Sequence, residues 1–527
     1  MASTAVSPTP TVEPAVPDFA HRRLILTAMC LALVMVVAGV SMLATSLPGL
    51  AADLGASQSS QQWIVDAYAL TLAALLLPAG ALGDRYGRRG ALIAGVALFG
   101  GAAGLAANAT SPGQLIALRA AMGIGAALLM PGTLSTITSV FPEEERAKAV
   151  GIWAGFATGG GTLGILASGA LLEKFYWGSI FLVTAAIALV TLVAIIVVVP
   201  STKSTEPVRF DPLGSLTSAI GIGLLVFGII EGPDRGWSDP VTLIGLAAGA
   251  LFIVGFVLVE LRAKAPLLDP RLFAHHGFAT GSASLFLQFF AMFAFFFVSL
   301  QYLQIVRGYG TLAAAVALLP MTVLIMPVAA VSGTLSERYG HRLVGGAGLA
   351  VSAVGFGAFA TLRPDSNFGL FLIATLIIGA GAALAMTPAT NAIIASLPRS
   401  KQGVASAVND SARELGAAFG VAVLGSVFNV GYRHSIDAHL GGLPTGVANQ
   451  AREAPAIAVR IAGHVPNGSA LTTAAHDAFA AGMRDSVLFG MGLLLLGAFF
   501  VWVRGASRVE EVFEDELDTD LITERVA

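Results

Sequence analysis

The sequence is poor in charge and almost without cysteine. Lys, Arg, Asp and Glu make up 12% of the 527 residues, about half of the roughly 25% found in soluble domains. The single cysteine, Cys30, allows neither an internal disulfide nor a cysteine-clustered metal site. A net charge of −3 provides no basic surface of the kind that binds nucleic acid. These shortages exclude a soluble enzyme, a disordered chain and a nucleic-acid-binding protein.

Motifs for metal or nucleotide chemistry are also missing from the sequence. The eight histidines form no HExxH pair, and no P-loop sequence occurs anywhere in the chain. Hydrolysis of ATP by a P-loop is therefore excluded. We expect no cofactor and no metal, and any uphill transport would need an ion gradient.

Hydrophobic residues make up 56% of the chain and occur in long runs. A bilayer core about 30 Å thick needs about 20 apolar residues as a helix. Runs without Lys, Arg, Asp or Glu are residues 24–52, 90–118, 150–172, 175–202, 212–230, 240–259, 277–306, 308–336, 343–362, 366–398 and 486–503. Three further runs contain charge, namely 63–83, 114–138 and 403–428. The sequence therefore predicts an all-α integral membrane protein with fourteen transmembrane helices.

Lys and Arg are concentrated in every second loop, on the side that holds both ends of the chain. Cytoplasmic loops carry such an excess, so we expect both termini in the cytoplasm. The apolar run after Arg22 and Arg23 is longer than that of a cleaved signal peptide, so it is interpreted as a retained first helix.

Two sequence patterns occur twice in the same order. Residues 80–89 read GALGDRYGRR and residues 333–342 read GTLSERYGHR, while GIGAALLM at 123–130 returns as GAGAALAM at 379–386. This recurrence predicts two related six-helix bundles, 24–199 and 279–503, as a parallel repeat. The segment 200–278 between them holds two inserted helices, about 213–230 and 241–261.

Three segments outside the predicted helices have distinct compositions. Residues 1–23 are rich in Pro, Thr and Ser and are predicted to form a disordered cytoplasmic tail, and residues 504–527 form an acidic one. A long outer loop is expected at about 430–480, with a short amphipathic helix near 451–461.

The chain resembles the major facilitator superfamily over nearly its whole length. The resemblance rests on Gly80 to Arg89, which is similar to that family's loop between helices two and three, and on LIALRAAMGIG at 115–125, which is similar to its helix-four motif. WIVDAY at 63–68 and AVNDSARELG at 407–416 resemble the fourteen-span drug:proton antiporters. That branch includes multidrug and quaternary-ammonium exporters of Gram-positive bacteria.

Two positions depart from the pattern of this branch. The family commonly has an Asp in helix one, nine residues before its terminal proline, where this chain has Gly39 before Pro48. The helix-five motif usually has Gly-Pro followed by a glycine pair, where this chain has Gly164-Ile165 and then Ser168-Gly169. The usual coupling carboxylate is therefore missing from helix one.

Ionisable residues within the spans are candidates for proton coupling, because each costs about 2.5–3.5 kcal/mol at mid-bilayer. Asp66 and Arg119 are expected at equal depth in helices two and four, which predicts a pair. Either the two residues form a static ion pair that locks the helix bundle, or Arg119 lowers the pKa of Asp66 as part of proton exchange.

A second group of charges lies in the thirteenth predicted span. Asp410 and Glu414 are four residues apart and so share one helix face, with Arg413 beside them. Either they lie at a water-exposed helix end and form a local salt bridge, or they form a second proton or cation site.

Further candidate functional residues are expected in the substrate cavity and at the gate. The cavity candidates are Trp63, Tyr68, Gln288, Phe289, Phe293, Asn409 and Arg413. The phenylalanines of the ninth span either pack against lipid and protein or form a wall for aromatic cations.

The resemblance implies a gating latch made by the repeated loops against a helix base near Gly403. Its candidates are Gly80, Asp84, Arg85, Gly87, Arg88, Arg89, Glu337 and Arg338.

The first functional hypothesis is proton-coupled efflux of amphipathic, cationic drugs by alternating access across a bacterial inner membrane. The second is a facilitator-type exporter of an endogenous antibiotic, siderophore or lipid, with atypical or absent proton coupling. A membrane-embedded enzyme or a channel is the third. It is disfavoured because the spans show no nucleophile–base pair and because a channel needs no paired latch loops. We expect lipophilic small molecules, protons and membrane lipids as partners, no nucleic acid, and a functional monomer.

Overall fold

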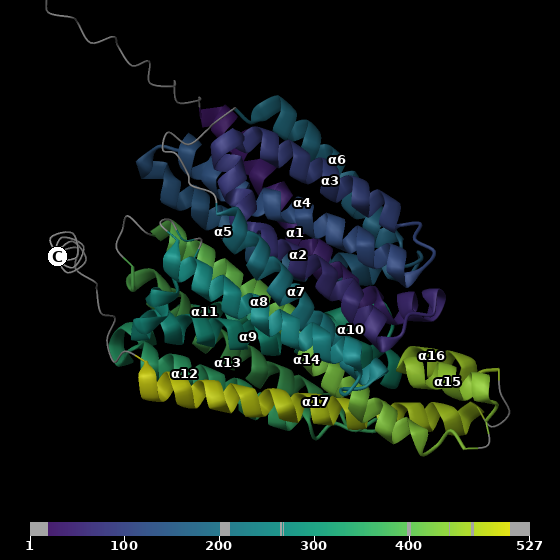
Figure 1. The fold of residues 1–527 in the computed structure, drawn as a ribbon. Helices are drawn as coiled ribbons and strands as arrows, with labels where there is room; N and C mark the ends of the chain where they lie inside the picture. The colour runs from purple at the N-terminus through teal and green to yellow at the C-terminus, as the bar shows by residue number, and fades with distance from the viewer. Residues whose placement is uncertain are drawn as a thin grey trace, which may run out of the picture.

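The computed structural model describes residues 19–505 apart from 201–210, 264, 265, 267, 398–401, 442 and 465–467. The described residues form helices joined by short connections (Figure 1). The long helices are α1 (Phe19–Leu54), α2 (Gln58–Tyr86), α3 (Arg88–Ala106), α4 (Pro112–Val140), α5 (Glu143–Leu172), α6 (Ser179–Val198), α7 (Pro212–Arg235), α8 (Pro240–Arg262), α9 (His276–Gln301), α11 (Leu319–Tyr339), α12 (His341–Phe359), α13 (Phe368–Ala395), α14 (Gln402–Asp437) and α17 (Gly468–Arg504). Shorter elements are η1 (Pro270–Ala274), η2 (Tyr302–Val306), α10 (Thr311–Ala317), α15 (Thr445–Glu453) and α16 (Pro455–Ala462). The two predicted tails fall almost entirely outside the described residues.

Twelve of the described helices are long and apolar enough to cross a membrane. α10 and α11 count as one of these spans, Thr311–Ser336. Two further helices, α2 and α5, have 29 and 30 residues and pack in the same bundle. The structure therefore confirms a multi-pass, all-helical membrane protein.

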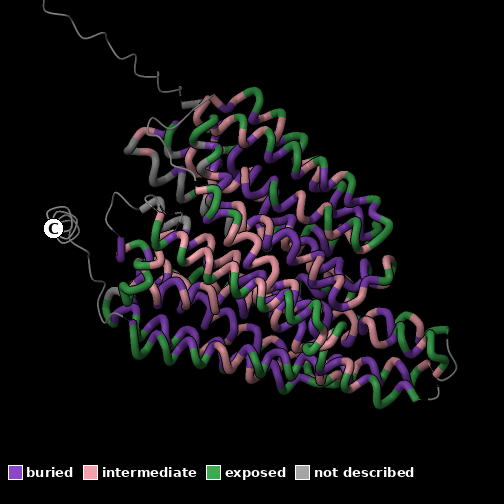
Figure 2. Tube along the Cα trace, viewed as in Figure 1, coloured by how far each residue is buried: buried purple, intermediate pink, exposed green. Residues whose placement is uncertain are grey.

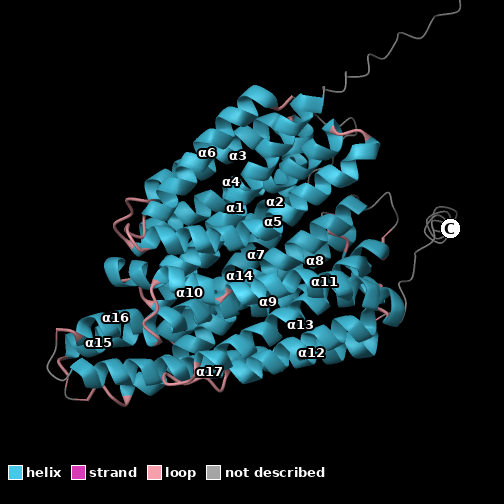
Figure 3. Ribbon diagram, turned by 180° about the vertical axis from the view of Figure 1, so that it is seen from behind, coloured by secondary structure: helices cyan, strands magenta, loops and turns pink. Residues whose placement is uncertain are grey.

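The helices pack in two groups (Figures 1 and 3). The N-terminal helices are α1 to α6 and the C-terminal helices are α9 to α17. α1 packs on α5 as α9 packs on α14, and α3 packs on α4 and α6 as α12 packs on α13 and α17. α7 lies against both α2 and α14, where the groups meet, and α8 packs on α7.

The two ends of the bundle differ. At one end α1 begins and α17 ends; this is called the termini end. The opposite end carries α15 and α16 and is called the loop end (Figure 1). The axes of the two groups converge towards the loop end and diverge towards the termini end (Figures 1 and 3). Buried positions run through the inside of both groups, and exposed positions follow their outer edges (Figure 2).

Capping residues set several helix starts. Ser57, Ser111, Asp211, Asp239 and Asn367 each accept a hydrogen bond from a backbone N–H of the first turn. Such caps satisfy donors that have no partner inside the helix. Prolines at the first turns of α4, α7 and α8 cost no hydrogen bond there.

The repeated loops have the same backbone form. Gly87 (φ 122°) ends α2 and Gly340 (φ 85°) ends α11, and each amide N–H donates to the carbonyl four residues earlier. Positive φ is easily reached only by glycine. The next helix begins at once in both places, at Arg88 and His341. The recurring sequence thus produces a recurring sharp turn.

The segment between α14 and α17 differs from the sequence prediction. A loop was expected at about 430–480, but α14 continues to Asp437 and α17 begins at Gly468. The one amphipathic helix expected near 451–461 is two, because the extended Ala454 and the following Pro455 separate α15 from α16. Both long helices contain polar residues outside the apolar runs, so the runs underestimated their length.

Glycines on α14 allow α9 to approach closely. A Cβ at Gly416 would lie 2.4 Å from the carbonyl oxygen of Phe286, and one at Gly420 would lie 2.1 Å from that of Phe290. Small residues permit such contact between membrane helices, where packing drives association. These two glycines hold the phenylalanine-rich helix α9 against α14.

We predict that Gly420→Ala destabilises the protein. The added methyl group must push α9 away from α14, at a cost of about 1–3 kcal/mol. The matched control is Gly492→Ala in α17, where a Cβ meets nothing within 4 Å. Thermal unfolding in detergent should show a lower Tm for the first variant and an unchanged or higher Tm for the second. Equal Tm values would contradict the close contact.

Candidate transport site

Asp66 is completely buried and faces the place where α2, α7 and α14 meet, called the α2–α7–α14 seam. Its exposed fraction is 0%, and neither carboxylate oxygen has a hydrogen-bond partner among the described residues. One turn before it, the amide of Gln62 lies against Gly425 of α14. One turn after it, Leu70 packs in a cluster with side chains of α7 and α14. Asp66 therefore lies between the two helix groups.

Arg119 does not pair with Asp66, which corrects the pair expected from their equal depth. Its Nε donates to the Ile64 carbonyl at 2.9 Å, and its guanidinium carbon lies 4.3 Å from the centre of the Tyr68 ring. Ile64 and Asp66 are two residues apart, which places them about 200° apart around α2. Arg119 contacts α2 on the side of Ile64 and Tyr68, whereas the Asp66 side chain faces the opposite side of that helix.

Gly39 lies beside Arg119. One terminal guanidinium nitrogen of Arg119 donates to the Gly39 carbonyl at 3.3 Å, and the other has no partner among the described residues. A Cβ at Gly39 would meet the ring of Phe99 at 3.1 Å. The helix-one Asp of the resembled family would thus lie next to this cation. In this chain Phe99 occupies that space, and Asp66 does not take over the missing acid's position.

The second charged group does come together as the spacing indicated. Arg413 lies 3.9 Å from Asp410, and both side chains are partly exposed, at 40% and 36%. The Arg413 guanidinium carbon lies 4.7 Å from the ring centre of Phe289, which stacks on Phe293. Glu414 is half-buried on the same helix. These five residues are called the carboxylate–phenylalanine cluster.

The other cavity candidates lie elsewhere. Trp63 donates to Glu231 of α7 at 3.1 Å, and the fully buried Tyr68 donates to the Val36 carbonyl. Gln288 is buried inside the C-terminal helices, and Asn409 donates to Thr390 of α13 at 3.1 Å. Among the described residues, no hydrogen bond joins any of these four side chains to the carboxylate–phenylalanine cluster.

The gating candidates lie at the termini end. Arg85 stacks on Tyr86 and Arg338 on Tyr339, at 5.4 and 5.3 Å from the ring centres. Arg88 donates to the Ser135 carbonyl, Arg89 to that of Ile196, and Gly80 lies against Pro131. The side chains of Asp84 and Glu337 and the helix base near Gly403 fall outside the described side chains. The latch implied by the resemblance stays a prediction.

Hydrogen bonds between the two helix groups gather at the loop end. Gln304 donates to the Thr45 carbonyl at 3.0 Å, and Thr311 donates to the Gly169 carbonyl at 3.0 Å. Arg460 of α16 lies 3.9 Å from Asp53 at the end of α1. These contacts close the loop end in this arrangement.

The departure in helix five has a structural explanation. Ser168 takes the place of a glycine, and its hydroxyl lies 2.5 Å from that of Thr45 in a buried hydrogen bond. Gly164 keeps its close approach, because a Cβ there would lie 2.9 Å from the Cα of Ala38. The serine therefore ties α5 to α1 next to the closed loop end. Sequence reasoning missed this role, since Thr45 carries no motif.

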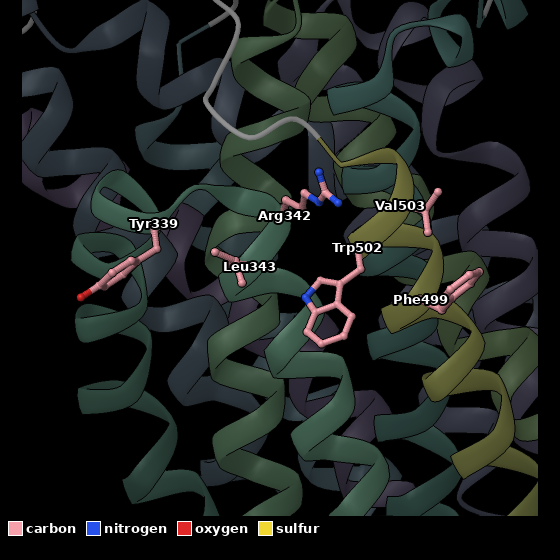
Figure 4. A pocket seen from close by; sticks show the side chains of 6 residues that line it. All are labelled: Tyr339, Arg342, Leu343, Phe499, Trp502 and Val503. Atoms are coloured by element: carbon pink, nitrogen blue, oxygen red, sulfur yellow. The ribbon is translucent and has the colours of Figure 1, made fainter.

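A surface hollow of ≈ 470 Å³ lies away from all these groups (Figure 4). It lies at the termini end of α11, α12 and α17. Its lining residues are Tyr339, Arg342, Leu343, Phe499, Trp502 and Val503. They are exposed on the outer side of the bundle, where aromatic and Arg side chains are typical of a membrane interface. This hollow is not part of the carboxylate–phenylalanine cluster.

The fold is that of a membrane transporter, with two packed helix groups that meet at one end. Residues 29–421 match the Major Facilitator Superfamily. The chain belongs to this family and is a multi-pass protein of the bacterial inner membrane.

Curated relatives cover most of the chain. The Multidrug efflux pump LfrA of Mycolicibacterium smegmatis is 34% identical over 91% of this chain and 95% of its own length. The Methyl viologen resistance protein SmvA of Salmonella typhimurium is 34% identical over 88% and 94%. The Tetracenomycin C resistance and export protein of Streptomyces glaucescens is 31% identical over 76% and 74%.

Solved transporters share the fold at low identity. An inward-facing, unoccupied bacterial homologue of the human lysosomal transporter Spinster is 20% identical, with a TM-score of 0.64, covering 94% of this chain and 99% of its own. A D-xylose–proton symporter is 15% identical, with a TM-score of 0.58, covering 92% and 98%.

We predict that Gln304→Leu combined with Thr311→Val opens the loop end more often. Each lost hydrogen bond is worth about 1 kcal/mol, so losing both shifts the equilibrium by about 30-fold. Spin labels at the exposed Glu173 and His464, in a background without Cys30, should show a new longer-distance population.

Thr361→Val serves as the control, because that hydroxyl bonds only to the Ala358 carbonyl of its own segment. An unchanged distance distribution in the double variant would show that these bonds do not hold the loop end closed.

Proposed function

We propose that the protein exports amphipathic, cationic compounds from a bacterial cell in exchange for protons. It does so by alternating access between two related six-helix bundles. In this arrangement α2 and α5 bring the twelve spans to fourteen, and α7 and α8 are the inserted pair. The termini end faces the cytoplasm and the loop end faces outside.

The repeated packing supports the two-bundle organisation. The pairings of α1 with α5 and of α9 with α14 correspond, and the turns at Gly87 and Gly340 occupy matching places. Lys and Arg at the termini end fit the distribution of cytoplasmic loops. Contacts at the loop end and diverging axes at the termini end fit an inward-facing state of such a transporter.

The observation that carries the substrate class is the position of Arg413. Its guanidinium stacks on Phe289 and lies beside Asp410, so a cation already occupies an aromatic and acidic site. Aromatic faces attract organic cations, and nearby carboxylates add to that attraction. A lipophilic cation can bind there by displacing Arg413 from the ring. One relative is named for resistance to methyl viologen, which is itself an aromatic dication.

Drug export is coupled to proton entry because the cationic compound and the proton compete for Asp410 and Glu414. An ionised carboxylate near the membrane centre is stabilised by a bound cation and otherwise favours the protonated form. Drug binding at the termini end therefore releases a proton there, and protonation from outside releases the drug. Asp66 is completely buried, whereas Asp410 is partly exposed and Glu414 is half-buried, so Asp410 and Glu414 are the carboxylates that exchange with the cytoplasm.

A second candidate is a facilitator-type exporter of an endogenous compound with atypical coupling. Gly39 in place of the family's helix-one acid favours it, and so do relatives named for export of tetracenomycin C and cephamycin. The two functions differ in whether a substrate moves protons.

We predict that a lipophilic cation collapses a pH gradient, acidic inside, in everted vesicles that contain the protein. The probe is tetraphenylphosphonium. Glu414→Gln and Asp410→Asn should slow this collapse by about 100-fold, because they remove the group that carries the proton. Glu173→Gln, an exposed carboxylate at the loop end, should leave the rate unchanged.

Binding of the probe is measured in the same variants to separate coupling from recognition. If the wild-type protein moves no protons with any lipophilic cation, the facilitator function is favoured. If both acid variants keep the wild-type rate, the proton site lies elsewhere.

A further inference from the structure

Buried polar side chains of α2 form a strip along the α2–α7–α14 seam. Gln58, Ser59, Gln62 and Asp66 are at most 3% exposed. At 100° per residue they share about 100° of the helix circumference. Asn429 of α14 faces the same strip, since its amide lies 3.4 Å from the Ser59 hydroxyl. The strip runs from the loop end to Asp66.

Many polar atoms of this strip have no partner among the described residues. They are Nε2 of Gln58, both amide atoms of Gln62, both carboxylate oxygens of Asp66 and Oδ1 of Asn429. A buried polar atom without a partner costs about 1–3 kcal/mol, and folded proteins leave only a small number of them. Water bound between such groups removes this cost. The clustering of these atoms on one face points to a hydrated seam.

The strip has one polar end and one apolar end. At the loop end, Asp234 of α7 and Arg433 of α14 form an ion pair at 2.5 Å, and each side chain is about a quarter exposed, at 27% and 26%. Asn429 contacts Asp234 at 3.4 Å and so connects this pair to Ser59. Beyond Asp66, α2 continues with Ala69 and Leu70, which pack with apolar side chains of α7 and α14.

We propose that this strip is a water-filled proton path that leads from the loop-end surface to Asp66 and stops there. The proposal rests on the proposed proton coupling and adds the entry route for the proton. Asp66 takes up a proton from outside in this arrangement, and the proton passes on to Asp410 and Glu414, which exchange with the cytoplasm, only when the two helix groups rearrange. The apolar residues beyond Asp66 prevent a continuous leak across the membrane in this arrangement.

Other charged groups surround the mouth of the path. Glu231 and Arg235 of α7 pair with each other, and Trp63 donates to the same Glu231. Burial raises the pKa of the Glu453 carboxyl, an effect that Arg433 opposes and Asp234 reinforces. The mouth therefore holds three acids and two arginines, which favours water and protons over larger anions.

Silver-ion accessibility of single cysteines tests the path. Cys30 is the chain's one cysteine, so Cys30→Ala gives a thiol-free background. Ser59→Cys and Gln62→Cys are placed on the strip. Ile64→Cys, equally buried at the same depth but on the opposite face of α2, is the control. Ag⁺ fits where water fits, and it is applied in chloride-free medium to vesicles of each orientation.

Modification is read as lost maleimide labelling after denaturation. The strip cysteines should react at least about tenfold faster than the control, which is reached only by local opening. The faster reaction should come from the loop-end side. Rates equal to that of Ile64→Cys, or faster reaction from the termini end, would overturn the proposal. Gln62→Cys decides the matter if Ser59→Cys does not fold, as judged by its Tm.

A transport measurement separates this proposal from the proposed function. Asn429→Leu removes a polar partner from the strip without touching the carboxylate–phenylalanine cluster. It should slow drug-driven proton movement by about tenfold while leaving tetraphenylphosphonium binding unchanged. An unchanged rate of proton movement would contradict the path. Absent proton movement in the wild-type protein would instead contradict the proposed function, whatever the silver result.

Discussion

Every charged side chain inside the hydrocarbon must find compensation, and this constraint decides where the chemistry of the protein can occur. Arg119 is compensated by two backbone carbonyls and a tyrosine ring. Arg413 is compensated by Asp410 and a phenylalanine ring that a ligand can compete for. Asp66 has no hydrogen-bond partner among the residues that the structure describes. The first arrangement is fixed by packing, whereas the other two can change with protonation or binding.

The same constraint explains the position of α7. α7 covers the line where α2 and α14 meet, and its carbonyls at Ile229 and Ile230 accept hydrogen bonds from Ser426 and Ser59. Without α7, the polar strip of α2 would face lipid, which cannot satisfy hydrogen bonds. α7 therefore makes a polar seam between the two helix groups possible. It also contacts both groups, so their relative movement must alter the contacts of α7.

The sequence predicted the elements of the fold well but the partners of the charges poorly. Apolar runs and the repeated loop sequences located the long helices, because both signals are local. The positions of Asp66 and Arg119 along their own helices are also local information. Their directions around α2 and α4 depend on which helices pack where, so the expected pair was not found. The hydrogen-bond partner of Trp63 could not be predicted for the same reason, since Glu231 belongs to α7. Asp410, Arg413 and Glu414 could be grouped correctly because they share one turn of α14.

The central claim is that carboxylates within the membrane release protons when a cationic compound binds. Difference infrared spectroscopy tests it most directly, because a protonated carboxylic acid has a carbonyl band that the ionised form lacks. Addition of tetraphenylphosphonium to the protein in lipid should remove such a band in the wild type, and the change should be absent in Glu414→Gln combined with Asp410→Asn. A wild-type spectrum in which the compound binds but no carboxylic-acid band changes would contradict the account.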